Sequence, residues 1–157
     1  MENYEELLIS LRKIIRSIDL HSKDLNKSAG MTGPQLVVLQ VICKNEGTTA
    51  KALAEKVNLS QGTITTILDR LEGRTLIQRV RSETDRRSVR LNLTEQGKSL
   101  LLKAPKPLQA HFIERFKKLP NDRQEVLLDA FAQVATMMDA SELDAAPMLE
   151  IGQIDKK

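Results

Sequence analysis

Apolar residues recur every three or four positions along most of this chain, which predicts a mainly helical protein. Residues 4–28 fit one long amphipathic helix, whose apolar positions are Tyr4, Leu7, Leu8, Leu11, Ile14, Ile15, Ile18 and Leu25. A first helix this long is often an arm that needs a partner to cover its apolar face. Gly30 is expected to end it.

Two shorter helices are predicted next. Thr32 and Gln35 have the spacing of a capping box and Pro34 suits a first turn, so one helix should cover about 33–45, with apolar residues Leu36, Leu39, Val41 and Ile42. After a turn at Glu46 and Gly47, Thr48 or Thr49 should cap a short third helix that carries Leu53, Ala54 and Val57.

The stretch 60–93 is the most informative part of the chain. Ser60 can cap a helix and Gly73 can end it in a left-handed turn, and between them lies one apolar stripe of Ile64, Ile67, Leu68 and Leu71. The opposite face is small and polar, with Gly62, Thr66 and Asp69 at its centre and Thr63, Thr65 and Arg70 at its edges. Another surface could therefore approach this helix closely.

After Gly73 the apolar period changes from 3.6 to 2, which predicts a two-stranded hairpin with one packed face. Val89, Leu91 and Leu93 alternate with polar residues on its second strand. Residues 74–90 contain no lysine but six arginines against two acids: Arg74, Arg79, Arg81, Arg86, Arg87 and Arg90 against Glu83 and Asp85. A helix with a bare polar face beside an arginine-rich hairpin indicates a module that meets a polyanion.

Helices are expected again beyond the hairpin. Thr94 should cap one of them, and Pro105 and Pro107 should kink or break it before it resumes and stops near Pro120. Asn121 can cap a last long helix with Val126, Leu127, Ala130, Phe131, Val134, Ala135 and Met138 on its apolar face. The acidic end from Ser141, which contains Pro147 and Gly152, should be irregular.

The length of the chain agrees with one domain, or with one domain plus an oligomerisation arm. The 157 residues carry a formal charge of only +3, but the basic charge is concentrated in the central third and residues 139–157 are acidic. No apolar run is long enough for a membrane span and the amino terminus is not a secretory signal, so a cytoplasmic protein is expected. One cysteine excludes an internal disulfide or a cysteine-clustered zinc site.

The central residues resemble a known family. The sequence LSQGTITTILDRLEGRTLIQRVRSETDRRSVRLNLTEQG is similar to the winged helix-turn-helix core of the MarR family of bacterial transcription regulators, across residues 32–97. The resemblance implies a mainly α fold with a small β-hairpin wing, in which a winged helix-turn-helix carries N- and C-terminal helical dimerisation arms. The implied divisions are an arm at 1–30, the DNA-binding domain at 31–97, a second arm at 98–140 and an acidic tail at 141–157.

The same resemblance implies a homodimer that binds double-stranded DNA. It puts Ser60, Gln61, Thr63, Thr65 and Thr66 in or beside the major groove, and Arg70 at a phosphate or the groove edge. Arg86 and Arg87 at the hairpin tip would contact DNA, with Arg87 in the minor groove and Asp85 holding its shape by a hydrogen bond within the hairpin. Arg79, Arg81 and Arg90 are less specific, and half of them could simply pair with Glu83 or Asp69.

Chemically, this set of side chains suits DNA, since glutamine pairs with adenine and a threonine methyl contacts thymine. The alternative is a solvated helix face, but threonine is a poor helix former there. The sequence departs from the family pattern in two places. The segment Glu72-Gly73-Arg74-Thr75 has an arginine and a threonine where the family often has a glycine, and the fifth helix contains two prolines.

Other residues carry weaker signals. Cys43 on the second helix is expected to be a buried, inert thiol, and His21 and His111 to be surface or interface residues rather than metal ligands. Core packing accounts for Tyr4, Phe112, Phe116 and Phe131; the alternative is a pocket between the arms and the DNA-binding lobe, where some family members hold small molecules. A small-molecule effector therefore stays open, while no cofactor is expected.

Two further readings concern function. The segment APKPLQAHFIERF and the tail MMDASELDAAPMLEIG resemble a branch of the family that controls compatible-solute genes, such as those for ectoine. The resemblance implies a DNA-binding regulator, more often a repressor than an activator. The alternative is a winged-helix module that binds proteins and has no DNA target. An enzyme would need a catalytic constellation or a phosphate-binding glycine loop that this sequence lacks.

Overall fold

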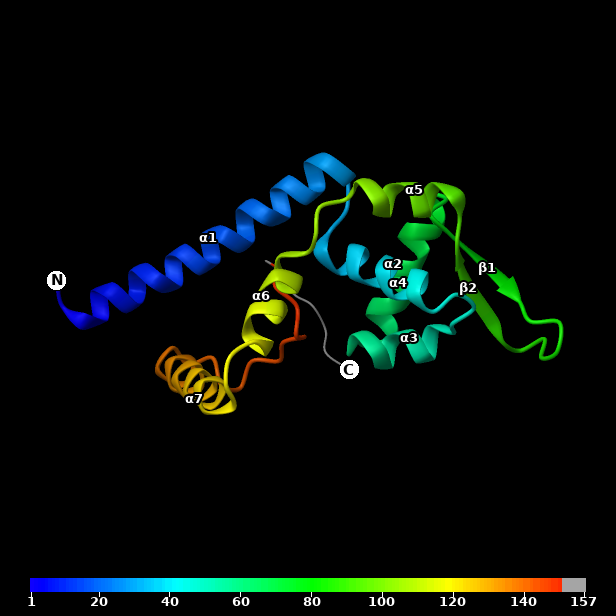
Figure 1. Ribbon diagram of the computed structural model, residues 1–157. Coiled ribbons are helices and arrows are strands. Elements are labelled where there is room, and N and C mark those ends of the chain that lie inside the picture. The colour runs from blue at the N-terminus through cyan, green and yellow to red at the C-terminus, as the bar shows by residue number, and fades with distance from the viewer. Residues whose placement is uncertain (151–157) are drawn as a thin grey trace.

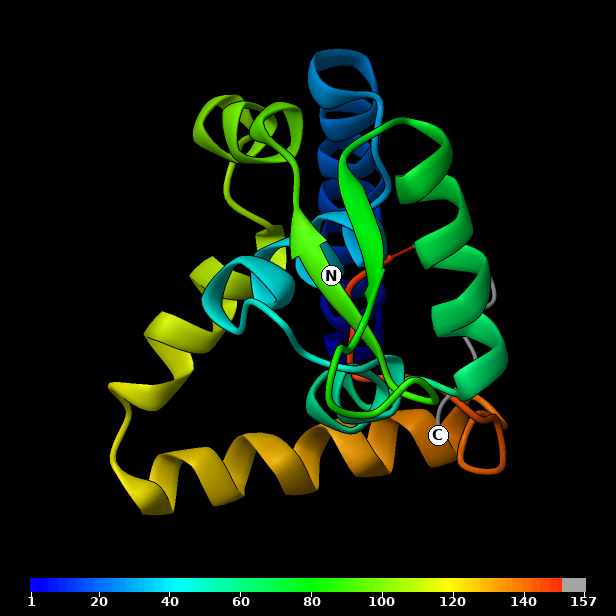
Figure 2. The same cartoon turned by 90° about the vertical axis from the view of Figure 1, so that its right-hand side faces the viewer.

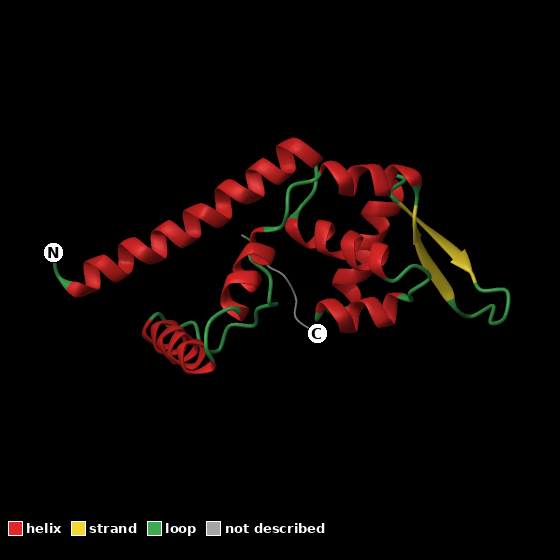
Figure 3. Cartoon of the chain, viewed as in Figure 1, coloured by secondary structure: helices red, strands yellow, loops and turns green. Residues whose placement is uncertain are grey.

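The computed structural model describes residues 1–150 and is mainly helical with one antiparallel hairpin, which confirms the predicted fold class (Figure 3). In chain order the elements are α1 (Asn3–Ala29), α2 (Gly33–Lys44), α3 (Ala50–Val57), α4 (Gln61–Gly73), β1 (Ile77–Arg81), β2 (Val89–Leu93), α5 (Glu95–Lys103), α6 (Leu108–Lys117) and α7 (Asn121–Met137). Within the described residues, no helix is long and apolar enough to cross a membrane.

One aliphatic core holds α2, α3, α4, α5 and the base of the hairpin together as a lobe. Its largest fully buried side chains are Leu25, Met31, Leu36, Leu39, Ile42, Leu53, Leu59, Ile64, Leu68, Leu71, Ile77 and Leu91. Figure 1 shows that α1 leaves this lobe as a single long rod, while α6 and α7 lie below α1. The lobe is therefore a packed domain, whereas the terminal helices extend away from it.

Local capping signals fix where most helices begin. The Thr32 hydroxyl accepts from the Gln35 amide and the Gln35 side chain accepts from the Thr32 amide, which is the predicted capping box. Thr49, Ser60 and Thr94 cap α3, α4 and α5 in the same way through their hydroxyl oxygens. Of the two candidates for α3, Thr49 is the cap.

The hairpin pairs Ile77 with Leu93, Arg79 with Leu91 and Arg81 with Val89. Ile77, Leu91 and Leu93 are buried, but Val89 is exposed because the outer part of the hairpin projects beyond the lobe (Figure 1). A backbone bridge between Thr48 and Leu91 adds a short third edge. The base of the hairpin is thus held by the core, and its tip stands free of it.

Two predicted helix ends are wrong. Gly73 is the last residue of α4 and the left-handed residue is Thr75, with φ 59°. The Thr75 amide donates to the Glu72 carbonyl and the Leu76 amide to the Leu71 carbonyl, a pattern that sets the turn two residues later and buries Leu76 against the core. Asn121 does not cap α7, because it is already helical and Pro120 occupies the cap position.

Two predictions about burial are also wrong. The Cys43 side chain is exposed, because it lies on the side of α2 that faces away from the core, whereas the neighbouring Ile42 is fully buried. Tyr4, Phe112 and Phe131 are also more than half exposed instead of packing in the core. They lie on α1, α6 and α7, outside the aliphatic lobe, and the Phe112 and Phe116 rings stack on each other at 5.5 Å.

The proline pair breaks the helix as predicted. Helix α5 ends at Lys103, residues 104–107 are extended or irregular, and α6 begins at Leu108. Residues 141–150 are irregular as well, and the Glu150 carboxylate accepts a 2.9 Å hydrogen bond from the Gly33 amide at the start of α2. Gly152, the other breaker expected in the tail, lies outside the described residues.

Candidate nucleic-acid interface

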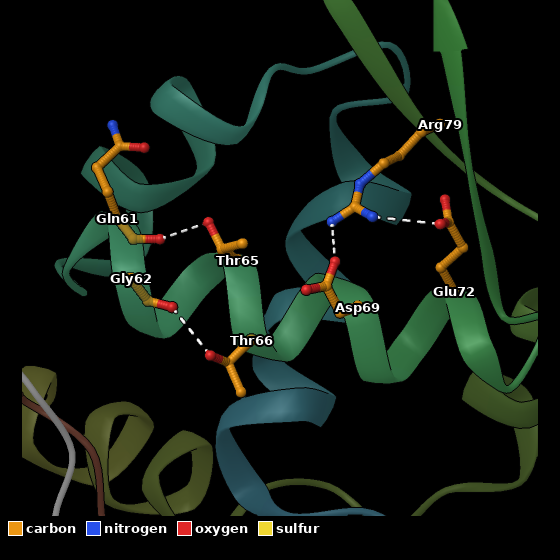
Figure 4. Close-up of polar contacts among 7 residues, drawn as sticks. All are labelled: Gln61, Gly62, Thr65, Thr66, Asp69, Glu72 and Arg79. Carbon is orange, nitrogen blue, oxygen red and sulfur yellow. Dashed lines mark hydrogen bonds and ion pairs between the residues drawn. The ribbon is translucent and has the colours of Figure 1, made fainter.

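The polar side of α4 is an exposed surface. Ile64, Ile67, Leu68 and Leu71 are buried as the stripe predicted, so the helix turns its other side outward. Gln61, Gly62, Thr65, Thr66, Asp69 and Arg70 are all exposed. Figure 4 shows Gln61, Thr65 and Thr66 over the first turns of α4 and Asp69 and Glu72 further along it.

Thr65 and Thr66 use their hydroxyl protons within the helix. The Thr65 hydroxyl donates to the Gln61 carbonyl at 2.9 Å, and the Thr66 hydroxyl donates to the Gly62 carbonyl at 3.1 Å (Figure 4). Their oxygens remain acceptors and their methyl groups are the remaining contact surface. This geometry favours methyl contacts with thymine and acceptor contacts over the donation to phosphates that the sequence alone also allowed.

Ser60 and Thr63 shape the start of α4. The Ser60 oxygen accepts from the Thr63 amide at 3.1 Å, and its hydroxyl donates to the Thr63 hydroxyl oxygen at 2.8 Å. Both residues are half-buried. Their observed role is to order the first turn, which leaves Gln61 as the exposed amide side chain at this end of the helix.

Three of the six arginines in residues 74–90 make hydrogen bonds or ion pairs with other residues of the chain. Arg74 donates to the Ala29 and Gly30 carbonyls at the end of α1, and Arg90 donates to the Gly47 carbonyl. Arg79 pairs with Asp69, as the sequence suggested, and also with Glu72. The raw count of basic residues therefore overstates the charge that this region offers to a polyanion.

The wing tip is ordered by its own side chains. The Asp85 carboxylate accepts a 3.0 Å hydrogen bond from the Arg87 amide, so the bond predicted within the hairpin is present and runs to the backbone of Arg87. The Ser82 hydroxyl oxygen accepts from the Asp85 amide at 3.4 Å, and the Ser88 amide donates to the Asp85 carbonyl at 2.9 Å. These bonds close the tip into a compact turn that carries Arg86 and Arg87 on its surface.

Four arginines of α4 and the hairpin remain available. Arg70, Arg81, Arg86 and Arg87 are exposed, and within residues 1–150 none of their guanidinium groups makes a hydrogen bond or an ion pair. In Figure 2 the helix α4 stands beside the hairpin, and Figure 1 shows that the tip of the hairpin projects past the lobe. A convex helix and an adjacent basic finger can engage neighbouring grooves of a duplex.

Comparisons with known proteins agree with this architecture. The sequence profile of the MarR family matches residues 31–89. The chain is 36% identical over 104 residues to the organic hydroperoxide resistance transcriptional regulator of Bacillus subtilis (strain 168), an alignment that covers 66% of this chain and 71% of that protein. The family match at residues 31–89 includes α2, α3, α4, β1 and the tip of the hairpin.

Solved structures extend the similarity to the terminal helices. A MepR-like protein complexed with pseudoligands is 25% identical with a TM-score of 0.59, covering 88% of this chain and 97% of that chain. The transcriptional repressor CouR, bound to a 23-mer DNA duplex, is 27% identical with a TM-score of 0.55, covering 85% of this chain and 92% of that chain. The likeness therefore includes the arms as well as the lobe.

Proposed function

Because this chain belongs to the MarR family of DNA-binding transcription regulators, we propose that it is a homodimeric repressor that reads an inverted-repeat operator. The exposed polar face of α4 beside a basic wing carries this proposal. The similar CouR is described as a transcriptional repressor bound to duplex DNA, which supports the same role here.

In the proposed complex, α4 is the recognition helix and lies in the major groove. Gln61, Thr65 and Thr66 meet base edges, while Ser60 and Thr63 keep the first turn in place beside the backbone. Arg70 meets a phosphate or the groove edge, and Arg86 and Arg87 reach the adjacent minor groove. Asp85 holds the tip in shape through the Arg87 amide.

The terminal helices supply the dimer interface in this proposal. The arms at 1–30 and 98–140 expose large apolar residues: Tyr4, Leu7, Leu8, Ile14, Ile15, Phe112, Val126, Leu128, Phe131 and Met137. In the described helices α6 and α7 no residue is buried at all. Exposed apolar helix faces of this size usually pack against another surface. The same arms of a second copy can supply that surface, because a two-fold interface pairs each patch with itself.

Dimerisation and operator geometry are linked. Two lobes related by a two-fold axis would place two α4 helices about one helical turn of DNA apart, so the operator should be an inverted repeat. Sedimentation velocity of the full chain at micromolar concentration should give twice the chain mass. A monomer at that concentration, or a selected site without two-fold symmetry, would contradict the proposal.

Selection of sites from random duplexes, followed by binding titrations, tests the DNA contacts. Gln61→Ala should weaken binding to the selected site and relax the preference at one base position in each half-site, because a buried bidentate contact carries about 1–3 kcal/mol of discrimination. Gln96→Ala on the exposed side of α5 is the matched control and should bind normally. Binding that is weak, indifferent to sequence and insensitive to Gln61 would favour the protein-interaction alternative.

We propose osmotic-stress genes, such as those for compatible solutes, as the targets. Support comes from the similarity of residues 104–116 and of the tail to a family branch that controls such genes. Intracellular salt is then the simplest signal, because phosphate contacts weaken as ionic strength rises. Footprinting upstream of genes near the protein's own gene tests the target class.

A small-molecule effector is the alternative signal. An open groove of about 1190 Å³ runs along α1, lined by residues between Ile9 and Asp24 and by Leu108 of α6. The His21 Nε2 atom is buried there without a hydrogen-bond partner among the described residues. Release of operator DNA by KCl, compared with release by ectoine at fixed ionic strength, separates the two signals: only release by the solute points to this groove.

A further inference from the structure

One guanidinium joins the hairpin to the outer side of α4. Arg79 lies on β1, and its Nη2 atom is 2.8 Å from Asp69 Oδ1 while its Nη1 atom is 3.2 Å from Glu72 Oε1 (Figure 4). Asp69 and Glu72 are three residues apart and therefore neighbours on the helix. We call these three residues the clamp.

The clamp sits where the hairpin loses its support from the core. On the strand pair, Arg79 is opposite Leu91, which is 1% exposed, whereas the next residues outward, Val80 and Val89, are 46% and 38% exposed. The other side of the hairpin is tied to the turn before α3 by Arg90 and the Gly47 carbonyl. The clamp is therefore the side-chain contact that ties the outer hairpin to α4 within the described chain.

The two carboxylates are costly on a surface that approaches DNA. Asp69 lies one turn beyond Thr66 on the exposed face of α4, and its side chain is 60% exposed. A negative charge near phosphates lowers affinity for any duplex. Such a charge is expected at this place only if it does something that outweighs the repulsion.

We propose that the clamp is a positioning device that sets the angle between α4 and the wing, so that both reach neighbouring grooves of one duplex. Arg79 and the two carboxylates act through Arg87 and the polar face of α4, and none of them reads a base. Arginine suits this task because its planar group donates in fixed directions to two carboxylates at once, whereas the lysine ammonium is a compact charge on a flexible stem that does not fix their positions. The inference rests on the proposed function, because it assigns a role within that DNA complex.

The sign of one measurement separates positioning from simple electrostatics. If the carboxylates only repel DNA, Asp69→Asn and Glu72→Gln should tighten binding, because each removes a negative charge. If they position the wing, the same substitutions should weaken binding to the selected operator by about 3- to 10-fold, a range typical of coupled contacts. Binding to random duplex should stay equal or become tighter.

Glu83→Gln is the matched control. Glu83 is exposed on the wing and lies outside the clamp, so its neutralisation should leave operator binding unchanged or slightly tighter. Arg79→Lys should behave like Asp69→Asn, because the ammonium lacks the planar fork that holds both partners in fixed positions. The exchanged pair Arg79→Asp with Asp69→Arg should recover part of the lost operator affinity, which a base-reading role for Arg79 would not allow.

Each outcome decides the matter. Tighter operator binding by Asp69→Asn and Glu72→Gln, equal to that of Glu83→Gln, overturns the positioning role and leaves the proposed function intact. Loss of thermal stability that fully parallels the loss of affinity, with random-duplex binding reduced equally, also overturns it. A wild-type chain that prefers no duplex sequence overturns the proposed function itself, and with it the inference.

Discussion

The side chain of Arg74 donates a 2.6 Å hydrogen bond to the carbonyl of Gly30, and so joins the end of α4 to the end of α1. A second bond of 3.1 Å runs to the Ala29 carbonyl. These carbonyls belong to the C-terminal turn of α1, where a positive charge is favourable because of the helix dipole.

Arg74→Met should therefore destabilise the fold. The substitution keeps an apolar stem but removes both charge-assisted hydrogen bonds, and a loss of about 1 kcal/mol is expected because the site is largely exposed. Urea unfolding followed by circular dichroism measures it. Arg115→Met, at an exposed position of α6, is the control, and equal stability of the two variants would show that the Arg74 link contributes nothing.

Thr75→Gly should stabilise the protein. Thr75 has φ 59°, a conformation that a β-branched residue adopts at a cost of about 1–2 kcal/mol and glycine adopts freely. Thr75 makes its hydrogen bonds through the backbone, which glycine keeps: its amide donates to the Glu72 carbonyl, and its carbonyl accepts from the Thr94 hydroxyl. Thermal unfolding should give a higher midpoint for the glycine variant; a lower midpoint would mean that the unfolded-state entropy of glycine outweighs the relieved strain.

Which features the sequence could predict depends on the range of the interaction that fixes them. The helix starts at Thr32, Ser60 and Thr94 were predictable, because a cap involves residues only three positions apart. The end of α4 was not, because it depends on Leu76 reaching the core and on Arg74 reaching α1, 44 residues earlier.

The same distinction holds for the candidate interface. The exposed face of α4 followed from helical periodicity alone. The division of the arginines did not, because the pairing of Arg79 with Asp69 depends on how the hairpin lies against the helix. The aromatic residues were assigned to the core because their side chains are apolar, but Phe131 lies on an arm that the lobe does not cover.

Glu114 should make stability depend on pH at the acidic end. A 2.6 Å hydrogen bond from Lys106, with the attraction of its charge, lowers the pKa of the Glu114 carboxyl. A lowered folded-state pKa means that the contribution is present above the ordinary glutamate value, about 4.3, and is lost as the pH falls through the lowered one. The pair joins the segment between the two prolines to α6.

Glu114→Gln should accordingly lower the thermal midpoint at pH 7 and have little effect at pH 3, where the wild-type carboxyl is protonated too. The difference should be small, because the pair is exposed and screened by solvent. Glu125→Gln, at an exposed position of α7, is the control. An equal loss at both pH values would assign the effect to something other than the charge of Glu114.

Gly62 and Gly73 provide a paired test of how closely DNA approaches α4. Within the described chain, a Cβ built at either position meets no atom within 4 Å, so alanine at both should be tolerated and should stabilise the helix by up to about 1 kcal/mol. Gly62 lies in the first turn on the exposed face, whereas Gly73 is the last helical residue. Gly62→Ala should weaken operator binding severalfold while Gly73→Ala should not. Equal affinities would place the first turn of α4 away from the groove.

Arg87→Ala tests the wing. Its guanidinium is exposed at a tip that Asp85 orders through the Arg87 amide, so the alanine variant should keep the same turn and lose only the side chain. Binding should weaken by about 1–3 kcal/mol, and the dependence of log K on log salt should become shallower by about one ion for each lost contact. The loss should be largest at operators with A·T-rich flanks, because their narrow minor grooves attract arginine most strongly.

Arg115→Ala is the control, because it changes the net charge equally at a position on α6, and it should bind like the wild type. Full affinity and an unchanged salt slope for Arg87→Ala would remove the wing tip from the interface and leave α4 as the contacting element.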